Sequence, residues 1–77
     1  MSGPELWCQV ALVDPDGFVI EGRAISGRGH PDLQAVEEVA RLAWRVSRLG
    51  GRARLSEVSK EMAELLELSG LRLEVER

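Results

Sequence analysis

Two kinds of hydrophobic spacing alternate along the chain and divide it into segments. Apolar residues at every second position, typical of strands, occupy residues 6–13, 18–25, 52–55 and 71–75. Apolar residues at every third or fourth position, typical of amphipathic helices, occupy residues 33–49 and 58–69. The sequence therefore predicts the order strand, strand, helix, strand, helix, strand.

Turn and capping residues mark the ends of the predicted elements in the first half of the chain. The tetrapeptide Asp14-Pro15-Asp16-Gly17 predicts a tight hairpin turn, with Gly17 at a positive φ. Pro31 fits the first position of the long helix, and Asp32 fits its first turn. Gly50 is expected to follow that helix with left-handed backbone angles.

Capping and glycine residues also mark the ends of the second predicted helix. Ser56 is the expected N-cap of the second helix, and Glu57 is favourably placed near the positive end of its dipole. Gly70 is expected to end that helix, with Leu71 supplying the apolar contact that often follows a glycine stop.

These elements predict an α/β fold with two layers. The first two strands should pair antiparallel, and helical crossovers should make the last three strands parallel to one another. Right-handed crossovers then place both helices on one face of a mixed four-stranded sheet. The prediction is one domain over residues 1–77, either minimal or truncated.

Alternation along the strands assigns their two faces. Leu6, Cys8, Val10 and Leu12 should face the helices together with Phe18, Ile20 and Ala24, leaving Val19, Glu21 and Arg23 on the outside. The outward positions of the last two strands are charged: Arg52, Arg54, Arg72, Glu74 and Glu76. The outward positions of the hairpin are apolar: Trp7, Ala11, Val13 and Val19. Such a patch marks a partner or a self-association surface, and Trp7, Val13 and Val19 are its candidates.

Along the long helix, the apolar stripe should contain Leu33, Val36, Val39, Ala40, Ala43 and Val46. The polar positions opposite include Gln34, Glu37 and Arg41, and Trp44 lies at the margin. Trp44 is either tucked under the edge of the sheet or available as an anchor for a partner, since tryptophan is enriched at binding hot spots.

Composition narrows the function. The formal net charge is −3, which argues against general nucleic-acid binding. Cys8 is the single cysteine, so no internal disulfide can form. No apolar run approaches the length of a membrane span, and the N-terminus does not have the pattern of a signal peptide. A cytoplasmic α/β domain is expected.

The loop from Ser26 to Asp32 has two interpretations. It is either a structural turn or an anion or nucleotide site, in which backbone N–H groups, Arg28 and His30 hold a phosphate. The glycine spacing is not that of a nucleotide-binding loop. One histidine and one cysteine do not make a metal site, and no nucleophile lies beside His30 in the sequence. Neither a cofactor nor an enzymatic activity is predicted.

The segment RLGGRARL followed by SEVSKEMAELLELSGL, within residues 42–71, resembles the C-terminal part of STAS domains, and HPDLQAVEEV resembles their helix start. These are the modules of anti-sigma-factor antagonists and of sulfate-transporter cytoplasmic tails. The resemblance implies a non-enzymatic module in a regulatory assembly, binding an anti-sigma-factor-like protein or a transporter component. It implies a docking surface made of the loop and the long helix: Arg28, His30, Asp32, Gln34, Glu37, Arg41 and Trp44.

The chain departs from that family in two ways. The hairpin leads straight to the long helix, without the extra helix and strand of a full STAS domain, and no final helix follows the last strand. The position of the phosphorylatable serine falls within Leu33 to Ala35, where there is no hydroxyl. Partner competition or a ligand, rather than phosphorylation there, is the expected regulation. Anion binding at the loop and homodimerisation through the hairpin remain the alternatives.

Overall fold

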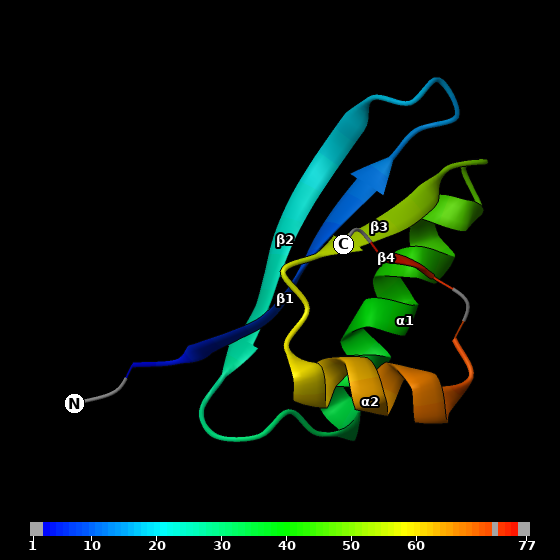
Figure 1. The fold of residues 1–77 in the computed structure, drawn as a ribbon. Coiled ribbons are helices and arrows are strands. Elements are labelled where there is room, and N and C mark those ends of the chain that lie inside the picture. The colour runs from blue at the N-terminus through cyan, green and yellow to red at the C-terminus, as the bar shows by residue number, and fades with distance from the viewer. Residues whose placement is uncertain (1–2, 72, 76–77) are drawn as a thin grey trace.

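The fold is described from a computed structural model, which covers residues 3–71 and 73–75 (Figure 1). Its elements are β1 (Glu5–Val13), β2 (Val19–Gly27), α1 (Leu33–Ser47), β3 (Arg52–Ser56), α2 (Lys60–Ser69) and β4 (Glu74–Val75). They form an α/β fold with one four-stranded mixed sheet in the order β2-β1-β3-β4. The predicted fold class and element order are confirmed.

The strand directions follow from the connections. β1 runs antiparallel to β2 and to β3, and β3 runs parallel to β4. Both helices lie on the same side of the sheet (Figure 1). The two crossovers, β2-α1-β3 and β3-α2-β4, therefore leave the opposite face of the sheet uncovered by either of the two described helices.

The core lies between the sheet and the two helices. On α1, the stripe that faces the sheet is centred on Val39, which is fully buried. Leu33 was predicted in that stripe but is 69% exposed, because six residues of helix rotate it about 120° away from Val39. The contiguous buried cluster consists of Cys8, Val10, Leu12, Ile25, Ala35, Val36, Val39, Leu42, Val46, Ala53, Leu55, Met62 and Leu66.

The glycine turns are where the sequence predicts them. Gly17, Gly50 and Gly70 have φ values of 94°, 80° and 77°, in the region where a Cβ would be strained. Leu71, directly after Gly70, packs against the core cluster as expected. The long helix is shorter than predicted, since it ends at Ser47 rather than at Leu49.

The start of the second helix was predicted wrongly. Its N-cap is Ser59, whose hydroxyl accepts a hydrogen bond from the Met62 N–H at 3.1 Å. Ser56 is still a strand residue, paired with Gln9 of β1. Because β3 extends one residue further than predicted, the second helix begins later in the chain. Glu57, which follows at a φ of 50°, lies in the connection rather than in the first turn.

Two register shifts in the hairpin change its faces. The first lies between Leu6 and Cys8 of β1 and leaves Trp7 without a partner in β2. The second lies between Leu12, which pairs with Glu21, and Val13, which pairs with Val19, so that Ile20 of β2 has no partner in β1. Each is a β-bulge, which interrupts the strict alternation of side chains. As a result, Glu21 and Arg23, which were predicted on the outer face of β2, point to the helix side of the sheet. Three of its residues face the helices opposite the buried side chains of β1, in the pairs Leu12↔Glu21, Val10↔Arg23 and Cys8↔Ile25.

The last strand is shorter than the alternation predicts, since β4 comprises only Glu74 and Val75. Leu71 and Leu73 precede it and pack against the core. The carboxylate of Glu74 forms salt bridges with both outward arginines of β3, with Arg52 at 3.4 Å and with Arg54 at 3.8 Å. The predicted outward positions 72 and 76 lie outside the described residues.

Candidate functional site

The loop before α1 uses its polar groups to build the fold. The Asp32 side chain accepts hydrogen bonds from the N–H groups of Gln34 at 3.0 Å and Ala35 at 3.2 Å. Asp32 is thus the N-cap of α1, just outside the first turn where it was predicted. Its carboxylate occupies the place at the helix N-terminus where an anion would bind, so this geometry does not favour the anion-site interpretation of the loop.

The glycines of the same loop accommodate Trp7. A Cβ on Gly27 would lie 2.3 Å from the indole ring, and the indole N–H donates to the Gly29 carbonyl at 3.2 Å. Trp7 is half-buried and packs against the core cluster. The prediction that it belongs to an open outer face is wrong, because the bulge in β1 removes it from the alternation.

His30 connects the loop to the second helix. Its Nδ1 pairs with the carboxylate of Glu61, in the first turn of α2. The hydrogen bond to Glu61, and then the negative charge of that group, raise the pKa of His30 above its usual 6.5. Both side chains are well exposed, as is Arg28. This contact holds the loop and α2 together at the surface.

The exposed face of α1 forms a single row. Its residues are spaced by three and four positions, so they lie one above another along the helix. The row consists of Gln34, Glu37, Arg41, Trp44 and Arg48, and all five are exposed. Four of them are predicted docking residues, and the structure brings them together. Arg28, His30 and Asp32 lie beyond the N-terminal end of this row.

Trp44 is the aromatic residue of this face. Its side chain is 61% exposed, so the alternative in which it is tucked under the sheet does not hold. The Arg48 guanidinium lies 4.9 Å from the centre of the indole ring, a cation–π contact that holds the ring in place. Within the described residues, neither Arg41 nor Arg48 makes a salt bridge.

A groove runs beside Trp44, between α1 and the segment that leads into β4. Its volume is about 590 Å³, and its walls include Ala40, Ala43, Leu71 and Leu73. Sequence reasoning missed this groove, because it is formed by two segments that are far apart in the chain. The alanines of α1 provided the only signal, since small residues leave space on a helix surface.

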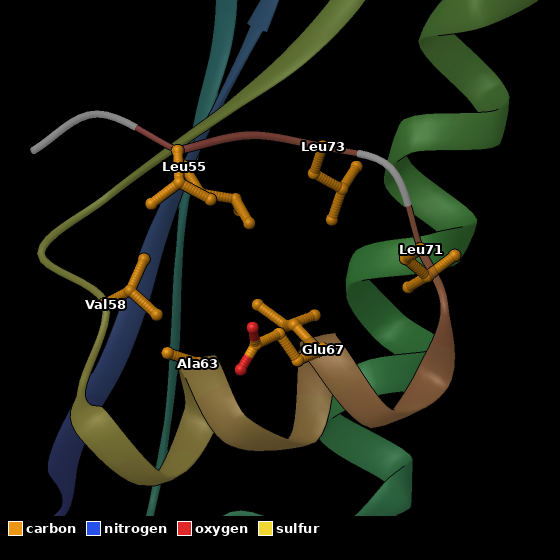
Figure 2. A pocket seen from close by; sticks show the side chains of 8 residues that line it. Leu55, Val58, Ala63, Glu67, Leu71 and Leu73 are labelled. Carbon is orange, nitrogen blue, oxygen red and sulfur yellow. The ribbon is translucent and has the colours of Figure 1, made fainter.

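A second hollow lies on the other side of the same segment. It measures about 520 Å³ and is lined mostly by apolar side chains, among them Leu55, Val58 and Leu73, with Glu67 at its edge (Figure 2). Leu71 and Leu73 line both hollows. Leu71 and Leu73 therefore cover the sheet incompletely and leave apolar surface on either side.

The residues predicted for self-association do not form one patch. Val13 is completely buried, which contradicts its assignment to an open face. Val19 is 62% exposed at the start of β2. The outer face of the hairpin instead carries small and polar side chains, including Gln9, Ala11 and Ala24.

Little in the described residues points to chemistry. Burial, and secondarily the charge of Glu38, raise the pKa of the Cys8 thiol to about 11, so it is a poor nucleophile at neutral pH. Within residues 3–71 and 73–75, no three His, Cys, Asp or Glu side chains gather as metal ligands. Neither described helix combines the length and apolar character needed to cross a membrane.

Comparison of the chain with models of known families, with curated proteins and with solved structures finds no match.

Proposed function

We propose that the chain is a non-enzymatic protein-interaction module that binds a partner protein through the exposed face of α1. The observation that carries this proposal is Trp44, exposed and held in place by Arg48 at the edge of an apolar groove. Tryptophan and arginine are the residue types most enriched at binding hot spots, and an ordered ring loses little entropy on binding.

The partner would place an apolar side chain in the groove between Trp44 and Leu73. Carboxylates beside that side chain would meet Arg41 and Arg48. The resemblance to STAS domains suggests a regulatory assembly in the cytoplasm, with an anti-sigma-factor-like protein or a transporter component as the partner. Because Leu33, Gln34 and Ala35 have no hydroxyl, such binding would not be switched by phosphorylation at the helix start.

Site-specific photo-crosslinking in cells of the source organism tests this proposal. A photo-reactive residue at Gln34 should yield one discrete adduct, and Trp44→Ala in the same chain should abolish it. The matched control places the photo-reactive residue at Leu68, which is 84% exposed and belongs to α2 rather than to α1. Equal adducts from both positions, or an adduct that survives Trp44→Ala, would contradict the proposal.

A further inference from the structure

β2 is a long strand with a free edge. It comprises nine residues and, within the part of the chain that the structure describes, pairs only with β1, at one end of the order β2-β1-β3-β4. In Figure 1 the cyan ribbon of β2 runs along the outside of the sheet, on the side away from β3 and β4. The edge of such a strand presents N–H and C=O groups that can pair with another strand.

Gly22 lies near the middle of β2, where neither the backbone angles nor the packing of the described residues requires a glycine. It does not have a positive φ, and a Cβ added to it would meet nothing within 4 Å. A glycine inside a strand weakens the strand. Strand side chains stand perpendicular to the sheet, so a larger residue at this exposed position would not lie between β2 and a strand paired to its free edge.

Opposite charges flank this glycine on one face. Glu21 and Arg23 both point to the helix side of the sheet, since they pair with the buried Leu12 and Val10. Their side chains form an exposed ion pair at 3.3 Å. Charged side chains on an edge strand generally hinder pairing with another strand, and like charges placed directly opposite each other are destabilising. The charges of β2 have opposite signs, and their spacing is symmetric about Gly22.

We propose that β2 pairs antiparallel with β2 of a second copy of this chain, around a two-fold axis at Gly22. Glu21 of each copy then lies opposite Arg23 of the other, which gives two complementary cross-strand pairs. Moving the axis to Glu21 or to Arg23 would place two like charges directly opposite each other. The charges therefore select one register among its neighbours.

Apolar side chains at the start of β2 and just before it support the same arrangement. Phe18, Val19 and Ile20 are 70%, 62% and 53% exposed, at the end of the strand that would run alongside residues 24–26 of the second copy. The bulge at Ile20 lies outside the three central pairs. Pairing extends the sheet across both copies and keeps the helices on one side, and a small chain gains stability from such association.

This dimer leaves the proposed docking surface open. The groove at Trp44 lies between α1 and the segment before β4, toward the opposite end of the strand order from β2. Loss of the dimer and loss of partner binding are therefore separate outcomes of separate variants.

Cysteine cross-linking tests the register. In the proposed dimer, Gly22→Cys lies opposite itself in the second copy, so mild oxidation should give a covalent dimer at protein concentrations where light scattering shows two chains. Ala24→Cys is the matched control, because it lies on the same exposed face but opposite Ile20 of the second copy. Cys8 is buried and does not compete. A single-chain mass at every concentration, or cross-linking at position 24 but not at 22, would overturn the proposal.

Charge reversal provides an independent measurement. Glu21→Arg and Arg23→Glu should each weaken dimerisation about tenfold or more, because both symmetry-related pairs become repulsive. The double variant E21R/R23E should restore most of the dimer, since the cross-strand charges are again complementary, although position 23 then carries a negative charge beside Glu38 of α1, which lies 3.9 Å from the native arginine. The control Glu64→Arg, on the exposed face of α2, should leave the dissociation constant unchanged. A dimer that withstands either single reversal, or is not restored by the double variant, would contradict this register.

Discussion

The hairpin and β3 follow the same alternation in sequence but differ in how the structure uses it. In β3, Ala53 and Leu55 are buried and Arg52 is exposed, as every second position predicts. In the hairpin, two bulges shift the pairing, so Trp7 packs inward and the predicted faces of β2 are reversed. The comparison shows that alternation assigns faces reliably only while the pairing register is unbroken, since one extra residue turns the following side chains to the other face.

The largest effect is expected where these two regions meet. A Cβ on Gly51, between α1 and β3, would lie 2.2 Å from the backbone oxygen of Val13 at the end of β1. Gly51→Ala should lower the free energy of unfolding by about 3 kcal/mol, because backbone rather than a side chain must move. Chemical denaturation measures this change.

The matched control for that variant is Gly22→Ala, whose Cβ would meet nothing within 4 Å. It should change the free energy of unfolding by less than about 0.5 kcal/mol. If both variants cost the same, the turn after α1 does not pack against the end of β1 as described.

Two valines of the hairpin test whether burial follows the alternation in the sequence or the pairing seen in the structure. Val13 and Val19 were both predicted on the outer face, yet Val13 is 0% and Val19 is 62% exposed. Val13→Ala should cost about 2 kcal/mol of stability through lost burial and a cavity, and Val19→Ala less than about 0.5 kcal/mol. Equal losses of stability for the two variants in thermal or chemical unfolding would show that both valines lie on the outer face, as the alternation predicts.

The start of α2 offers a smaller test in the second half of the chain. Ser59→Ala removes the hydroxyl that caps the helix and should cost about 1 kcal/mol. Ser56→Ala, at the end of β3, is the matched control and should cost less than about 0.5 kcal/mol. A larger loss at Ser56 than at Ser59 would show that the helix begins earlier, as the sequence alone suggested.

The smallest effect concerns the contact between the loop and α2. Because the folded-state pKa of His30 is raised, its protonated form stabilises the fold. That contribution is present below pH 6.5, the usual pKa, and is lost as pH rises through the raised value. NMR titration of His30, the only histidine, should show the raised pKa and its return toward 6.5 in Glu61→Gln. Glu64→Gln should leave the titration unchanged, and a pKa at or below 6.5 in the native chain would contradict the contact.

The candidate docking surface could be predicted in part. Helical spacing alone placed Gln34, Glu37, Arg41 and Trp44 on one face, because residues three and four apart are neighbours on any helix. The roles of the loop residues were not accessible in this way. Asp32 and His30 act through partners that only folding brings close: the first N–H groups of α1, and a carboxylate 31 positions along the chain. The groove beside Trp44 depends on the path of the segment before β4, which short-range patterns do not encode.

The sequence by itself determined the order of elements, the directions of the strands and the glycine turns. These features depend on local backbone preferences and on connection lengths, which act between residues close together in the chain. Only the tertiary structure decided which hairpin residues are buried, which serine caps α2, and that β2 ends as a free edge with charges arranged symmetrically about Gly22. Each of these depends on the pairing register between distant strands. Register is chosen by the packing of the whole core, with Trp7 against Gly27 and Val13 against Gly51 among its constraints.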